Sequence, residues 1–309
     1  MVDQPVGPGN VAMQAPTGHL EIEVGQYLVQ QQPATRTSPA GAAAAGRACL
    51  TAVLPAGAIT LLGAYLCEVL GGHPNLSALS GLLVTASFVY ALDRFVLHPE
   101  DPADVRQSRP LFGWMLAIAA LAQAALAAAV PKLAWGIVWG DLFGSAYALR
   151  FPVWRCRLKA VPFLKTAYTP FVIVSTTLLL LRAYPHSAAE WAIVVGAMVL
   201  CSLDTVLCDM KDIPSDRQAG IKTVANVLGA HAAIRLVQLI AALTTIGLLT
   251  LASLDRRTVP LAASFCCLAC FAALPSTKSS WPYLLGVECI ACSPLFFQHT
   301  LAYIKVAHG

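Results

Sequence analysis

The sequence predicts an all-α integral membrane protein with a bundle of about nine transmembrane helices. Of its 309 residues, 57% are hydrophobic and only 12% are charged, whereas a soluble domain carries roughly 25% charge. The apolar residues also form blocks that are long enough to cross roughly 30 Å of hydrocarbon. Lys and Arg occur in short clusters between these blocks rather than as a continuous basic surface, which argues against a nucleic-acid partner.

The apolar blocks can be placed in order along the chain. They cover residues 48–70, 75–97, 111–130, 133–149, 161–181, 189–208, 232–251, 258–275 and 281–301. Backbone polar groups must be satisfied within the segment in lipid, and the blocks lack the alternation of barrel strands, so we expect helices. The fourth and eighth blocks are short. Residues 1–47, rich in Pro, Gln, Gly and Ala, predict a flexible tail before a transmembrane domain at 48–305.

The loop charges predict the orientation. Twelve bases fall on the side of the N-terminus: Arg36, Arg47, Arg106, Arg109, Arg150, Arg155, Arg157, Lys159, Lys211, Arg217, Lys222 and Lys278. Five fall on the other side: Lys132, Arg182, Arg256, Arg257 and Lys305. Cytoplasmic loops collect Lys and Arg, so this bias predicts a cytoplasmic N-terminus.

The most informative stretch follows the sixth block. Asp209, Asp212 and Asp216 stand at i, i+3 and i+7, within about 60° on a helix. We expect Pro214 to end the regular helix near Asp212 and the aspartates to lie in a loop rather than in the bundle core. Carboxylate oxygens without His or Cys suit Mg²⁺, which commonly pairs them with substrate phosphates. The plain alternative is a solvated charged loop.

This stretch resembles the second aspartate-rich motif of the UbiA superfamily of intramembrane prenyltransferases, D-x-x-D-x-x-x-D followed by Gly, Thr and a further Gly. The matching residues are Asp209, Asp212, Asp216, Gly220, Thr223 and Gly229. The resemblance implies a cytoplasmic cap over a central cavity open to lipid. It also implies Mg²⁺ ions that bridge the diphosphate of a polyprenyl donor, with ionisation to an allylic cation that an acceptor attacks.

The first aspartate motif of the family, N-x-x-x-D-x-x-x-D, is only partly present. Asp93 takes the middle position, Arg94 follows it as in the family, and Arg109-Pro110 matches the later Arg-Pro pair. Val89 and Leu97 stand where the family has Asn and the last Asp. Glu100 or Asp101 is therefore a candidate substitute ligand. The alternative for Asp93 is an interfacial salt bridge with Arg94 or Arg109.

The basic loop before the fifth block resembles the family loop that holds a diphosphate-binding lysine. Lys159 and Lys165 of this stretch, with Arg94, Arg109 and Lys222 from other segments, are the candidate substrate-binding bases, and Tyr168 is a candidate lining residue of the cavity. For Lys165 the alternative is a positive-inside anchor, and for Tyr168 it is ordinary packing. The resemblance thus implies Asp93, Asp209 and Asp212 as catalytic residues.

The leading functional expectation is Mg²⁺-dependent transfer of a prenyl group from an isoprenoid diphosphate to an aromatic or quinone-precursor acceptor. A terpene cyclase acting on the diphosphate alone is the first alternative, and a transporter or membrane scaffold is the second. Ten cysteines include two Cys-x-x-Cys pairs, at 267–270 and 289–292. These pairs lie in apolar stretches, so apolar packing is favoured over structural zinc.

Overall fold

The computed structural model describes residues 39–96, 106–149, 158, 161–218, 220–273 and 281–308. The chain divides into two units, Met1–Ala42 and Ala43–Gly309. In the described part of the second unit every regular element is a helix, and each of the nine apolar blocks coincides with one long helix. These are α2 (Pro39–Val69), α3 (Leu76–Phe95), α5 (Arg109–Ala129), α6 (Ala134–Ala148), α7 (Leu164–Leu181), α8 (Ala188–Asp209), α11 (Ala230–Ala252), α12 (Val259–Ala273) and α13 (Trp281–His308).

Seven helices among the described residues are long and apolar enough to cross a membrane. Helix α6, formed by the short fourth block, has only 15 residues and is not one of them. Large apolar side chains remain exposed on the outer faces; Trp114, Ile118 and Leu121 of α5 are each 64–72% exposed. A helix of this kind requires an apolar solvent around it. The predicted class, an all-α membrane bundle, is confirmed.

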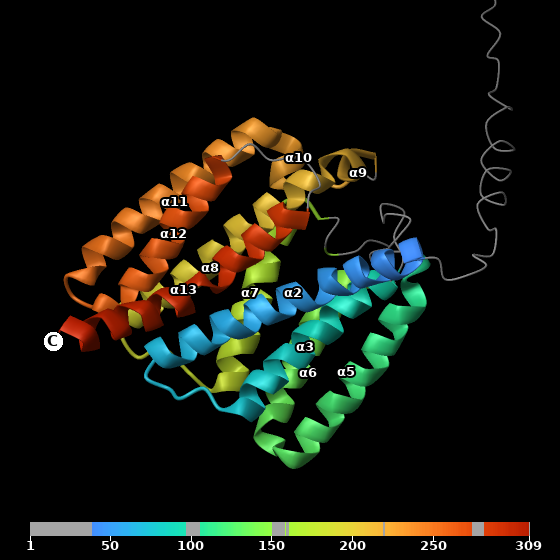
Figure 1. The fold of residues 1–309 in the computed structure, drawn as a ribbon, viewed down its shortest axis with the longest axis horizontal. Helices are drawn as coiled ribbons and strands as arrows, with labels where there is room; N and C mark the ends of the chain where they lie inside the picture. Colours follow the sequence, from blue (N-terminus) through green and yellow to red (C-terminus); the bar gives the residue numbers. More distant parts are fainter. Residues whose placement is uncertain are drawn as a thin grey trace, which may run out of the picture. The chain divides into compact units, whose positions relative to one another are not determined.

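Two of the three buried clusters among the described residues join most of the helices. Helices α11, α12 and α13 gather on one side of the bundle and α3, α5 and α6 on the other, with α2 and α7 between them (Figure 1). The larger cluster centres on α8, where Ile193, Leu200 and Leu207 are fully buried. The smaller one joins α3 and α6 to α2 and α7. Close approach of α6 depends on glycine, because a Cβ on Gly144 would lie 2.4 Å from Val89.

Polar caps fix the ends of several helices. Asn75 accepts a hydrogen bond from the N–H of Ala78 at the start of α3, and Ser187 accepts one from Glu190 at the start of α8. The short helices η3 (Met210–Asp212), α9 (Ile213–Gln218) and α10 (Val224–Leu228) follow α8, and η1 (Pro131–Leu133) and η4 (Arg256–Thr258) connect longer helices.

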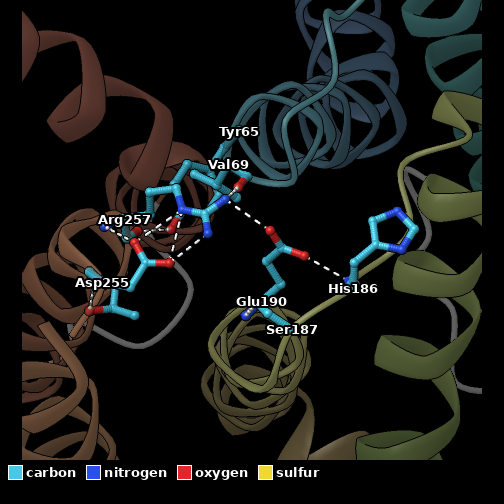
Figure 2. A network of polar contacts seen from close by, with 8 residues as sticks. Tyr65, Val69, His186, Ser187, Glu190, Asp255 and Arg257 are labelled. Atoms are coloured by element: carbon cyan, nitrogen blue, oxygen red, sulfur yellow. Dashed lines mark hydrogen bonds and ion pairs between the residues drawn. The ribbon is translucent and has the colours of Figure 1, made fainter.

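A polar network ties three elements together at the N-terminal end of α8 (Figure 2). Arg257 of η4 donates to the carbonyl of Val69 at the end of α2 (2.6 Å) and to Glu190 of α8 (3.0 Å). It also forms paired hydrogen bonds with Asp255, and Tyr65 donates to its carbonyl at 3.3 Å. Such multiple, charge-assisted contacts fix the relative positions of these ends.

Candidate active site

The centre of the candidate site is an ion pair between α7 and α8. Lys165, in the first turn of α7, donates a hydrogen bond to Oδ1 of Asp209, the last residue of α8. The Asp209 side chain is 0% exposed and that of Lys165 is 27% exposed. The expectation that Asp209 lies in a loop outside the core is therefore wrong. Packing of α7 against α8 closes over the carboxylate, and this burial is a tertiary effect that local sequence does not encode.

The regular α-helix ends three residues before Asp212, earlier than Pro214 predicts. The α-helix ends at Asp209, a 3₁₀ turn carries Asp212, and α9 begins at Ile213 with Pro214 in its first turn. Proline fits a first helical turn because that turn has no intrahelical use for its missing N–H. The three aspartates therefore lie on three successive elements and not on one helical face. Asp212 is half-buried, and its charge acts on both Lys165 and Asp209.

A compact turn holds the end of the motif. Asp216 is buried, and the Thr223 hydroxyl donates to its Oδ2 at 3.5 Å while accepting a hydrogen bond from the N–H of Asn226. Gly220 has a φ of 68° and Gly229 a φ of 79°, a left-handed backbone that other residues rarely adopt. A Cβ on either glycine would meet nothing within 4 Å, so backbone conformation alone requires glycine there.

This turn is also attached to the start of α7. The N–H of Phe163, itself at a positive φ of 60°, donates to the carbonyl of Lys222 at 3.1 Å. The bond fixes the residue two before Lys165 against the aspartate-rich segment. The side chain of Lys222 is exposed.

An open cavity lies among α2, α3, α6 and α7, with about 650 Å³ of empty space when the solvent at its mouth is included. Its walls are mostly apolar, and aromatic side chains and one carboxylate stand at the end nearer the C-terminus of α3. The lining residues are Ile59, Leu82, Thr85, Ala86, Val89, Tyr90, Asp93, Gly140, Gly144, Tyr147, Tyr168, Thr169, Val172, Ile173 and Thr176. From Leu82 to Asp93 the wall of α3 runs about 16 Å. Tyr168 lines this cavity, and its hydroxyl donates to the carbonyl of Phe143 at 2.8 Å.

Tyr147 connects the two aspartate motifs and was not found by sequence reasoning. It lines the cavity, stacks with Tyr168 at a centroid distance of 6.3 Å, and lies in the electrostatic range of Lys165, Asp93 and Asp209. No signal in the sequence distinguishes it from a packing aromatic of the fourth block. The structure thus brings Asp93 of α3 and the Lys165–Asp209 pair into the neighbourhood of one tyrosine.

The remaining candidates are dispersed. Arg94 is half-buried next to Asp93, and the Arg109 guanidinium lies 4.8 Å from the centre of the Phe95 ring. The alternative for Asp93, a salt bridge with Arg94 or Arg109, stays a prediction. Glu100, Asp101 and Lys159 lie outside the described residues.

Among the described residues, no three of the predicted carboxylates converge within the spacing of a single metal site. The group that does converge is Asp204 and Cys208 of α8 with Glu288 of α13. Sequence reasoning passed over it, although carboxylates inside apolar helical blocks are functional candidates by default. The four cysteines of the two Cys-x-x-Cys pairs are free thiols on α12 and α13.

Comparison with solved structures identifies the architecture. A UbiA homologue from Archaeoglobus fulgidus bound to GPP and Mg²⁺ matches with a TM-score of 0.55 and 15% identity, over 81% of this chain and 98% of that chain. A UbiA homologue from Aeropyrum pernix matches with a TM-score of 0.53 and 16% identity, over 78% and 97% of the two chains. This chain has the UbiA fold.

The Archaeoglobus protein is also known in complex with DMAPP and Mg²⁺ (TM-score 0.53) and with Cd²⁺ (TM-score 0.56), each at 15% identity. In sequence, no protein-family model matches the chain, and no curated protein gives a significant match. The shared fold, with the helices described above, makes the chain a multi-pass membrane protein.

Proposed function

We propose that this UbiA-fold protein is a member of the UbiA superfamily and a Mg²⁺-dependent prenyltransferase. It would move a prenyl group from an isoprenoid diphosphate to an aromatic or quinone-precursor acceptor. The observation that carries the proposal is the Lys165–Asp209 pair, with Asp212 beside it, close to the Tyr147 end of an apolar cavity. The Archaeoglobus protein of the same fold is known bound to GPP and Mg²⁺ and bound to DMAPP and Mg²⁺.

The aspartates suit Mg²⁺ as far as their donor atoms are concerned. Asp209 Oδ2 is shut off from solvent and accepts no hydrogen bond from the described protein, so a buried acceptor is left for a cation. Asp209, Asp212, Asp216 and Asp93 supply only oxygen donors, the type that Mg²⁺ prefers. When bound, Mg²⁺ would neutralise the negative charge that builds up on the departing diphosphate.

Lys165 is the base best placed to bind the diphosphate. Its side chain is 27% exposed, so its ammonium can contact a bound anion while Asp209 holds it in position. Arg94, and Lys222 and Lys159 from the loops, are the further candidate bases. Ionisation of the donor breaks its carbon–oxygen bond, and the diphosphate keeps the electron pair.

The cavity would hold the prenyl chain and keep water away from the cation. Apolar walls exclude the water that would otherwise capture an allylic cation. Tyr90, Tyr147 and Tyr168 line it, and tyrosine rings stabilise a nearby cation through their negative faces.

The same three tyrosines favour one second candidate, a terpene cyclase. A cyclase must stabilise a cation within the chain for several steps without an acceptor, and an aromatic-lined cavity does so. Purified protein should therefore be incubated with geranyl, farnesyl or geranylgeranyl diphosphate and Mg²⁺, with and without aromatic acceptors. Products that require an acceptor support transfer, whereas cyclic hydrocarbons or alcohols from the donor alone support cyclisation.

Matched variants make this experiment specific. Asp212→Asn is expected to abolish diphosphate release, whereas Asp255→Asn, which removes a carboxylate at the other end of the bundle, should retain it. Full activity of Asp212→Asn at saturating Mg²⁺ would contradict the proposed site. Uptake of substrate into proteoliposomes without any product would favour a transporter instead.

The proposal includes an orientation and a domain boundary. We infer that the ends carrying Asp93 and Asp209 face the cytoplasm, as the loop charges predict, with residues 1–47 as a tail on that side. The transmembrane enzyme domain would then extend over residues 48–305.

A further inference from the structure

A second group of potential ligands lies on α8, next to the candidate active site. Asp204 and Cys208 stand one helical turn apart on α8, and Glu288 reaches them from α13, which packs on α8. One ligand atom from each residue lies within 4.8 Å of the other two, and all three side chains are half-buried. Residues four apart share a helical face, so the α8 pair presents both ligands to the same neighbour.

Two polar atoms at this group lack a partner in the described protein. Asp204 Oδ1 is inaccessible to solvent and accepts no hydrogen bond. The hydroxyl of Tyr283, on α13, is likewise buried without a partner, and Tyr283 lies in the electrostatic range of Asp204 and Cys208. Buried polar atoms in native proteins nearly always have a partner, so these two atoms indicate a missing one.

The charges of the group are not balanced by protein contacts. Lys211 supplies the positive charge that acts on Glu288. Among the described residues, however, the Lys211 and Glu288 side chains form no ion pair within 4.0 Å. Two carboxylates at this spacing among apolar helices repel each other unless a proton or a cation is shared. A cation would also satisfy Asp204 Oδ1 directly.

The donor set selects the kind of cation. Mg²⁺ binds oxygen and rejects thiolate, whereas Zn²⁺ accepts carboxylate and thiolate together. Ligand atoms on a tetrahedral Zn²⁺ lie about 3.3–3.8 Å apart, so small side-chain rotations would close the observed group around one ion. We propose that Asp204, Cys208 and Glu288 bind a thiophilic divalent cation of the zinc type, with the Tyr283 hydroxyl or water as a fourth ligand.

Binding at this site joins α8 to α13 and releases the Cys208 thiol proton to solvent. The site is distinct from that of the proposed Mg²⁺, and its three ligands are not among the residues that line the cavity. Tyr90, which lines the cavity, lies in the electrostatic range of both Glu288 and Asp204. The ion would thus fix the wall next to Tyr90 without depending on a prenyl substrate.

The test uses the full-length protein purified in detergent and stripped of metal with a chelator. It is loaded with Co²⁺ or Zn²⁺ in a large excess of Mg²⁺, dialysed, and analysed for bound metal. Co²⁺ bound to a thiolate gives a sulfur-to-cobalt charge-transfer band, so the wild-type spectrum reports the cysteine ligand without any mutation. Asp204→Asn, Cys208→Ser and Glu288→Gln are compared with Cys289→Ser, which removes a neighbouring exposed thiol of α13.

We expect one retained equivalent in the wild type and in Cys289→Ser, with the charge-transfer band present in both. Cys208→Ser should lose the band, and Asp204→Asn and Glu288→Gln should lose at least nine-tenths of the retained metal. Asp212→Asn should keep the full equivalent even if it is inactive, which separates this site from the proposed catalytic one. Absence of the band in the wild type, or its persistence in Cys208→Ser, would overturn the proposal.

Discussion

Removal of either partner of the Lys165–Asp209 pair is expected to have unequal effects on stability. Lys165→Met leaves a carboxylate that is 0% exposed, whereas Asp209→Leu leaves an ammonium on a side chain that is 27% exposed. An uncompensated buried charge costs about 3–5 kcal/mol. The lysine can extend toward water, so its isolated charge should cost only about 1–3 kcal/mol. Lys165→Met should therefore be the less stable variant.

The double variant Lys165→Met/Asp209→Leu separates stability from catalysis. It removes both charges and leaves groups of similar size, so its stability should recover to within about 1 kcal/mol of the wild type. If the pair serves the reaction, the double variant nevertheless stays inactive. Thermal unfolding in detergent, followed by the folded fraction on size-exclusion chromatography, ranks the four proteins, and diphosphate release measures their activity.

Two results would refute this reasoning. Equal stability of the two single variants would show that the burial of Asp209 does not control the energy of the pair. Wild-type turnover by the stable double variant would show that the pair is a structural contact between α7 and α8, and the proposed site would fail. Lys165→Arg is the matched control, because it retains the charge and should keep most of the stability.

Three other regions give separate tests. Asp93→Asn should raise the Mg²⁺ concentration required for turnover, since a neutral oxygen binds the ion more weakly; an unchanged requirement would exclude Asp93 as a ligand. Arg257→Ala should lower thermal stability but not the metal requirement, because its network lies at the far end of α8 from Asp209. The hydrogen bond from Arg257 holds the pKa of Asp255 below its usual range. The Asp255–Arg257 pair therefore stabilises the folded protein fully above about pH 4, and this stabilisation is lost as the pH falls through the lower pKa of the folded state. The melting temperature of an Asp255→Asn variant should not show this fall at acid pH. A cysteine placed at Lys211 should react with an impermeant reagent only from the cytoplasmic side, and labelling from outside would contradict the proposed orientation.

Helix positions were predictable because lipid offers no hydrogen-bond partners to the backbone. An apolar block in a bilayer must satisfy its own hydrogen bonds, so block boundaries become helix boundaries, as in α3 and α7. Gly220 and Gly229 were identified by the motif spacing, and the structure explains glycine at both positions, because each has a positive φ. Local chemistry controls these features, and local chemistry can be read from sequence.

The burial of Asp209 was not predictable, because it depends on which helix covers the C-terminal end of α8. The same holds for Tyr147, whose place between the two motifs results from the packing of α6 against α3 and α7. Glu288 comes from a block that is 80 residues away from the Asp204 region in sequence. Contacts of this kind arise from the tertiary arrangement of helices, and apolar periodicity does not specify that arrangement.

The C-terminal end of α8 carries two donor sets on different faces. On a regular helix Asp209 lies about 140° from Asp204 and about 100° from Cys208, so it points to α7 and Lys165 while the other two point to α13 and Glu288. The face toward α7 offers carboxylate oxygen alone, and the face toward α13 adds sulfur. The chemical type of the donor atoms distinguishes Mg²⁺ from zinc-like cations more strongly than the location of the site on the helix does. The two faces should therefore bind different ions at the same time, so that Zn²⁺ bound at Glu288 does not compete with the Mg²⁺ that turnover requires. Loss of activity on stoichiometric Zn²⁺ binding in wild type, but not in Glu288→Gln, would instead show that the two faces are coupled through α8.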